Sequence, residues 1–176
     1  MTEISSLVST LLQKNSLMIY GRPGTGKSLM MNKVSIYLAE AGEKVLYIFN
    51  HPSAISNLSV ETERIVLLPL DDSNLMSSLI LAGNAVRRGF RLIVVDEIPT
   101  ELLYSIIGMR NTLFWISFLS NLARSFSRTL ILVSDELPAN LKLVSNYVDS
   151  VIMMERSGDF LNLELDSGTK LSLKLF

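Results

Sequence analysis

The sequence contains no cysteine and only one histidine, His51. Without cysteine the chain forms neither disulfides nor thiolate ligands, and a structural zinc site is not expected from one imidazole. An excess of one charge is also lacking, because 16 Lys and Arg residues face 17 Asp and Glu residues and leave a net charge of −1. A protein that binds nucleic acid over its whole surface is usually basic, so any such contact must be local or shared with a partner.

Long hydrophobic runs are missing as well, since no segment reaches the roughly 18 apolar residues that a membrane helix needs. The opening MTEISSLVST has no basic region of the kind that begins a secretory signal. We therefore expect no membrane partner and a cytoplasmic location. The 176 residues are enough for one domain with a core, and we expect a single domain over 1–176. The 48% hydrophobic share indicates either an apolar surface for a partner or a parallel sheet that is apolar on both faces.

Apolar runs alternate with longer helical patterns, which predicts an α/β fold with a mostly parallel central sheet flanked by helices. We expect strands at 16–20, 44–49, 64–70, 90–97 and 128–136, and helices at 27–42, 73–89 and 111–126. A short helix or irregular turn is expected at 138–150. The end of the chain differs, because turn sequences separate the strand-like segments 151–156, 160–166 and 171–176. This pattern predicts a C-terminal antiparallel hairpin.

The stretch GRPGTGKS, residues 21–28, matches the phosphate-loop pattern G-x-x-x-x-G-K-[ST]. Glycines let several backbone N–H groups point at one phosphate, and the following helix presents the positive end of its dipole. Lys27 is expected to reach the β- and γ-phosphates, and the Ser28 hydroxyl to ligate Mg²⁺. We therefore predict ATP or ADP as ligand and Mg²⁺ as cofactor. The predicted nucleotide-binding residues are Gly21, Arg22, Pro23, Gly24, Thr25, Gly26, Lys27, Ser28 and Leu29.

The second half of the predicted site is RLIVVDE, residues 91–97. An apolar run that ends in an acid places Asp96 at the carboxyl end of a central strand, where ligands bind in open α/β sheets. Asp96 is expected to hold the Mg²⁺ through water, opposite Ser28. Glu97 is a candidate general base beside the catalytic Lys27, or else the first residue of the outgoing loop.

Two strand-like runs, 44–49 and 64–70, separate the phosphate loop from Asp96 in the sequence. A strand inserted between the two motif strands is typical of RecA-like and AAA-type ATPases, and it argues against simple nucleotide kinases. Four segments, in addition, resemble the ATPase core of the RecA/RadA recombinase family, and its small archaeal paralogues most. They read SLMIYGRPGTGKS, AEAGEKVLYIFN, NTLFWISFLSNLARSFSRTLILVSDE and YVDSVIMMERSGDFLNLEL.

The resemblance covers about residues 10–176 and has functional implications. It implies a recombinase paralogue or mediator in DNA repair and homologous recombination, with weak Mg²⁺-dependent ATPase activity. Its implied partners are DNA, single-stranded rather than double-stranded, and a recombinase or paralogue protein. Two alternatives stay open: a nucleotide-gated interaction module with little or no hydrolysis, and a ring-forming motor ATPase of helicase or clock-protein type.

The sequence departs from the family where the family carries a catalytic glutamate after its second strand. This place reads Phe49-Asn50-His51-Pro52 and contains no acid. A neutral His or an Asn could orient a water molecule but is a poorer base than a carboxylate. Either Glu97 has taken over the role of the base, or hydrolysis is weak.

The resemblance also assigns two further candidate roles. Ser134 and Asp135 stand where family members carry a polar residue that senses the γ-phosphate, although a polar cap on a strand end explains them equally well. Arg110 is expected in the loop after the Asp96 strand, which corresponds to the family's first DNA-binding loop. It is therefore a candidate DNA contact, with a solvated loop charge as the alternative.

Overall fold

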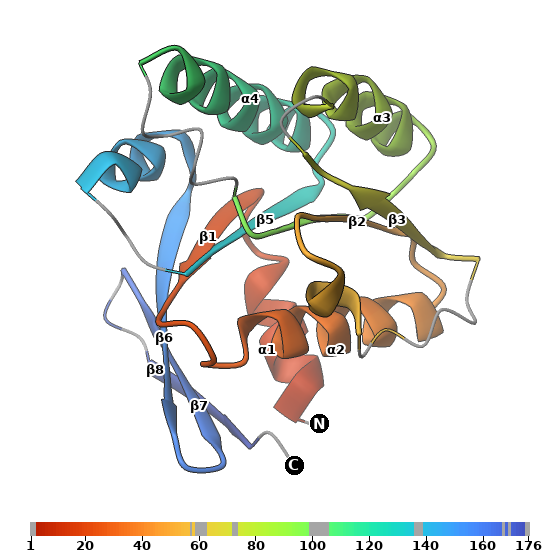
Figure 1. Ribbon diagram of the computed structural model, residues 1–176. Helices are drawn as coiled ribbons and strands as arrows, with labels where there is room; N and C mark the ends of the chain where they lie inside the picture. The colour runs from red at the N-terminus through yellow and green to blue at the C-terminus, as the bar shows by residue number, and fades with distance from the viewer. Residues whose placement is uncertain are drawn as a thin grey trace.

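The computed structural model describes residues 3–56, 58, 63–71, 74–98, 106–135, 139–166, 168 and 170–174. Within these ranges eight strands form one sheet in the order β3-β2-β4-β5-β1-β6-β7-β8 (Figure 1). The strands are β1 Ser16–Tyr20, β2 Val45–Phe49, β3 Ile65–Pro69, β4 Leu92–Asp96, β5 Thr129–Ser134, β6 Ser150–Ser157, β7 Phe160–Leu165 and β8 Lys170–Lys174. The helices are α1 Glu3–Leu11, α2 Lys27–Glu40, α3 Leu75–Arg87, α4 Ile106–Ser125 and the 3₁₀ segments η1 Pro52–Ile55 and η3 Ala139–Tyr147.

The strand directions confirm the predicted fold class. The neighbouring strands in the series β3-β2-β4-β5-β1-β6 pair in parallel. Strand β7 pairs antiparallel with β6 and with β8. One strand does lie between the phosphate-loop strand β1 and the Asp96 strand β4. That strand is β5, however, and the runs at 44–49 and 64–70 form β2 and β3 on the outer side of β4. Sequence order therefore predicted an inserted strand correctly but did not identify it.

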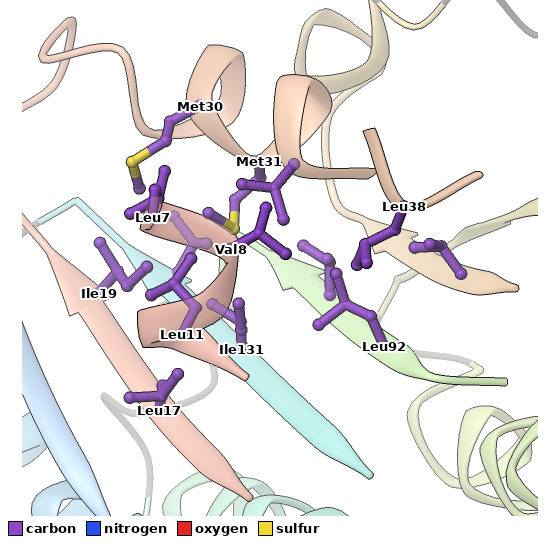
Figure 2. Packing of buried hydrophobic residues seen from close by; sticks show 14 of the residues in the cluster. Leu7, Val8, Leu11, Leu17, Ile19, Met30, Met31, Leu38, Leu92 and Ile131 are labelled. Carbon is purple, nitrogen blue, oxygen red and sulfur yellow. The ribbon is translucent and has the colours of Figure 1, made fainter. Parts of the chain in front are cut away.

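The helices cover both faces of the parallel part of the sheet. Helices α1 and α2 lie on one face, and α3 and α4 lie on the other (Figure 1). Leucines of α1 and methionines of α2 interdigitate with side chains of β1, β4 and β5 (Figure 2). Every residue of β4 and β5 is buried, as expected for central strands of a sheet packed on both faces.

The long helix α4 begins five residues earlier than the sequence pattern predicted, at Ile106. This first part of the helix contains Gly108, and Met109 packs against the core between α4 and the sheet. The prediction that Arg110 lies in a loop was therefore wrong, since Arg110 is an exposed residue of this helix. Helix α1 was not predicted at all, although its apolar residues form part of the core.

Strand register brings the predicted site residues to one edge of the sheet. Tyr20 at the end of β1 is paired with Ser134 at the end of β5, and Phe49 at the end of β2 with Asp96 at the end of β4. The segments that leave these four parallel strands consequently start side by side. They carry the phosphate loop, the residues after Phe49, Glu97 and Asp135.

Candidate functional site

The phosphate loop joins β1 to α2, and glycine is favoured in it for two different reasons. At Gly21 a Cβ atom would collide with the backbone carbonyl of Met154 on β6, so only glycine allows this close approach. At Gly24 the backbone has a φ of 78°, a conformation that favours glycine, and the space beside it is open. The loop thus keeps a clear surface lined by backbone, which is the shape that a phosphate group requires.

Lys27 is the first residue of α2, and its ammonium group turns back over the loop. Its Nζ donates hydrogen bonds to the carbonyl oxygens of Gly21 at 2.8 Å and Arg22 at 3.0 Å. It also forms an ion pair with Asp135 Oδ1 at 2.9 Å. The lysine side chain is 5% exposed, so its charge is held inside the loop by these contacts.

Ser28 and Asp96 meet as the sequence predicted. The Ser28 hydroxyl donates to Asp96 Oδ1 at 3.1 Å, and the hydroxyl of buried Tyr47 on β2 donates to Oδ2 at 2.5 Å. Burial raises the pKa of Asp96 above its ordinary value, and the bonds from Tyr47 and Ser28 and the charge of Lys27 oppose that rise. Burial and the neighbouring carboxylate likewise raise the pKa of Tyr47, which therefore stays a hydrogen-bond donor.

Glu97 follows directly after β4 in a conformation that non-glycine residues rarely adopt, with a φ of 74°. Its carboxylate lies 3.6 Å from His51 Nε2, an ion-pair contact when the imidazole is protonated. Glu97 also lines a hollow of about 30 Å³ together with Lys27, Ser28 and Asp96. A strained residue held at such a place is typical of functional sites, because the surrounding structure must offset a cost on the order of 1–3 kcal/mol.

A second, larger cavity of about 810 Å³ adjoins the phosphate loop. The residues that line it come from the loop, from β6 and from the end of β5: Tyr20, Gly21, Arg22, Pro23, Gly24, Thr25, Asp135, Met153, Met154, Glu155 and Arg156. Its volume falls in the range of cavities that hold small-molecule ligands. Asp135 is the residue that lines both this cavity and the small hollow.

The structure brings most predicted residues together and places a few elsewhere. Gly26 caps α2 by accepting the Met30 N–H, and Leu29 packs toward the core. Ser134 is buried at the end of β5 and lines the small hollow. Arg110 lines neither cavity.

Sequence reasoning missed two parts of the site. One is Tyr47, which looked like an ordinary strand residue. A phenol in a strand of otherwise aliphatic and aromatic residues needs a hydrogen-bond partner when buried, and that rule was the available signal. The other is the cavity wall of residues 153–156, for which the sequence offered no signal because the wall depends on β6 pairing with β1.

The residues at this edge fit a magnesium nucleotide. Ser28 and Asp96 supply one hydroxyl and one carboxylate, the donors with which Mg²⁺ is held when phosphates complete its shell. Among the described residues no three acidic or histidine side chains converge as a metal site. Protein groups alone would therefore not suffice, and phosphate oxygens would have to contribute.

Comparisons with known proteins identify the fold. No protein-family model and no curated protein matches the chain. A solved structure of a KaiC-like protein from the hyperthermophilic archaeon Pyrococcus horikoshii OT3 superposes with a TM-score of 0.69. The match covers 93% of this chain and 87% of that one at 15% sequence identity, which shows the fold and no more. In the described part of the chain, no helix is long and apolar enough to cross a membrane. The chain therefore shares the fold of this KaiC-like protein, an α/β fold with a mostly parallel central sheet and C-terminal antiparallel strands.

Proposed function

We propose that the protein binds Mg-ATP at the carboxyl edge of its sheet and hydrolyses it slowly, in the cytoplasm. The observation that carries this proposal is the contact between Ser28 and Asp96, 3.1 Å apart, on a hollow that Lys27 and Glu97 also line. These four residues come from two separate chain segments. Their convergence supports a site for the terminal phosphate of a nucleotide.

Each group of the site has a defined role in this proposal. The backbone N–H groups of residues 21–28 and the start of α2 bind the phosphates, and Lys27 contacts the β- and γ-phosphates. Ser28 and Asp96 would hold the Mg²⁺. The bound ion would supply neutralisation of the charge that develops on the phosphate oxygens. Tyr47 and Ser28 keep the Asp96 carboxylate in one orientation, since each donates to one of its oxygens.

Glu97 is the proposed general base. Its carboxylate accepts a proton from water while the water oxygen attacks the γ-phosphorus, and the bond to the bridging oxygen breaks to release ADP and phosphate. Two observations support Glu97: it lines the same hollow as Ser28 and Asp96, and its backbone is strained. His51, from the segment that carries no acid, contacts Glu97 and would hold it in place.

A second candidate is a nucleotide-gated interaction module with little turnover. It is favoured by the ion pair of Lys27 with Asp135, which engages the catalytic lysine within the protein itself. The two candidates differ in rate and share the binding site. A tight nucleotide complex that does not turn over would support the second candidate.

The biological role that we propose is assistance to a recombinase in DNA repair and recombination. Support comes from the sequence resemblance, and the exposed Arg110 on α4 is the proposed contact for single-stranded DNA. If Arg110 contributes one phosphate contact, Arg110→Ala should weaken DNA binding uniformly across sequences.

The test is ATP turnover at several protein concentrations, with and without single-stranded DNA, with Lys27→Ala as the blank. A rate that exceeds the blank supports the ATPase, and stimulation by DNA supports the recombination role. Turnover at the level of the blank under all conditions would contradict the catalytic role of Glu97. Turnover that DNA leaves unchanged would contradict the DNA-coupled role while leaving the ATPase intact.

A further inference from the structure

The ammonium group of Lys27 has all of its hydrogen-bonding capacity engaged by the protein. A lysine ammonium has three donors, and the three nearest acceptors are Gly21 O at 2.8 Å, Asp135 Oδ1 at 2.9 Å and Arg22 O at 3.0 Å. The two carbonyl oxygens belong to the phosphate loop itself. The carboxylate of Asp135 is the acceptor that comes from another element, the end of β5, and it carries a full charge.

Asp135 lines both the cavity of about 810 Å³ beside the phosphate loop and the hollow of about 30 Å³ at Ser28 and Asp96. The Asp135 side chain is 47% exposed, whereas that of Lys27 is 5% exposed. The carboxylate can therefore leave the ion pair for solvent, but the lysine cannot follow it.

The charges around the small hollow are unbalanced. Among the described residues that line it, Lys27 is basic, whereas Asp96, Glu97 and Asp135 are acidic. The Mg²⁺ proposed at Ser28 and Asp96 would offset negative charge on that side of the hollow, whereas the Asp135 carboxylate would remain a like charge beside a γ-phosphate. Repulsion between a phosphate and a nearby carboxylate weakens binding of the phosphate, and the repulsion is strongest where water is excluded.

We propose that Asp135 is a specificity-determining residue that stands in for phosphate on Lys27 and lowers the preference of the site for ATP over ADP. The inference rests on the proposed function, because it concerns the same phosphate site. A phosphate that binds Lys27 must take the place of one of its acceptors, and the Asp135 carboxylate is the one that carries charge and reaches solvent. ATP additionally brings its γ-phosphate beside that carboxylate, so the penalty is larger for ATP than for ADP.

The test compares the dissociation constants of Mg-ADP and of the Mg complex of a non-hydrolysable ATP analogue, adenylyl imidodiphosphate. Asp135→Asn removes the charge and nearly preserves the shape. It should tighten the ATP analogue on the order of tenfold and ADP about threefold or less, as expected for the loss of one nearby like charge. Asp159→Asn makes the same chemical change in the exposed turn between β6 and β7 and should alter neither constant. Asp135→Glu keeps the charge and should stay closer to wild type than Asp135→Asn does.

The outcomes separate the two proposals. Equal changes for both nucleotides in Asp135→Asn, or weaker binding of the ATP analogue, would overturn the role of Asp135 while leaving the nucleotide site intact. Failure of wild type and Asp135→Asn alike to bind either nucleotide would overturn the proposed function, and the inference with it. Binding that is seen in Asp135→Asn but not in wild type would support the inference in its strongest form. Thermal unfolding followed by circular dichroism checks that each variant folds. If Asp135→Asn does not fold, Asp135→Ser takes its place in the comparison.

Discussion

At the amino ends of β1 and β6, the Asp149 carboxylate lies between a cationic side chain and a backbone N–H donor, both of which favour its negative charge. Arg124 Nε and Nη2 donate to Asp149 Oδ1, and the Ser16 backbone N–H donates to Oδ2. Burial alone would raise the pKa of Asp149, but the bonds from Arg124 and Ser16 hold it below the ordinary value. At the carboxyl end of β4, Asp96 is buried beside neutral hydroxyls, and its pKa is raised. One end of the sheet therefore favours its charged carboxylate, and the other disfavours it.

The difference indicates separate tasks for the two ends. The amino end joins α4, β1 and the start of β6, and its contacts are completed by protein groups, including an Arg124 bond to the Tyr147 carbonyl. The carboxyl end holds a strained Glu97 and a lysine paired across the loop with Asp135. We expect changes at the carboxyl end to alter nucleotide chemistry and changes at the amino end to alter stability.

The largest effect is expected for Glu97→Gln at the carboxyl end. Loss of a general base lowers turnover by about 100-fold to 10,000-fold, and nucleotide binding should persist because the loop and Ser28 are unchanged. Single-turnover hydrolysis and nucleotide titration measure the two quantities separately. Glu43→Gln, the same change at an exposed residue between α2 and β2, is the matched control for turnover. If turnover in Glu97→Gln equals that of wild type, Glu97 is not the general base.

Tyr47→Phe should have an intermediate effect that depends on Mg²⁺. The Tyr47 hydroxyl donates to one oxygen of Asp96. Its loss should therefore reduce the gain in ATP affinity that Mg²⁺ provides by about tenfold, the lower limit for one hydrogen bond to a charged group. ATP binding in the presence of a chelator should stay as in wild type. Tyr37→Phe, from α2 and the same side of the sheet, is the control. If Tyr47→Phe weakens ATP binding equally with and without Mg²⁺, the Tyr47 hydroxyl does not act through the Mg²⁺ site and the residue serves only in packing.

Arg124→Ala at the amino end should leave nucleotide binding unchanged and lower the free energy of unfolding by about 1 kcal/mol. The value is modest because the Arg124 side chain is 37% exposed and water screens its ion pair. Urea unfolding followed by circular dichroism provides the measurement. Altered nucleotide affinity in this variant would break the proposed division between the two ends.

The smallest effect concerns pH and follows from the lowered pKa of Asp149. A carboxylate with a depressed pKa in the folded state stabilises the fold above its ordinary pKa of about 3.9, and this contribution is lost as the pH falls through the folded-state pKa. The stability difference between wild type and Asp149→Asn should thus be present at neutral pH and shrink in the acid range. Urea unfolding at a series of pH values tests this, and a difference that grows toward acid would contradict it.

The sequence predicted those parts of the site that depend on local pattern. The phosphate loop, Ser28 and Asp96 were found because residue spacing and the ends of apolar strands determine their place. Tyr47 and the cavity wall on β6 were missed because their roles arise from pairing between strands distant in the sequence. Arg110 was assigned to a loop because the helical pattern was taken to begin at residue 111 and the preceding segment was matched to a DNA-binding loop of the resembled family, whereas α4 begins at Ile106.

The most direct test of the account is calorimetric titration of Mg-ADP and Mg-ATP into wild type and Lys27→Ala. The account predicts one saturable site per chain in wild type, and affinity about 100-fold lower in Lys27→Ala, the upper range for hydrogen bonds to a charged group. Equal binding by the two proteins, or no binding of either nucleotide to wild type, would contradict the assignment of the carboxyl edge as a nucleotide site.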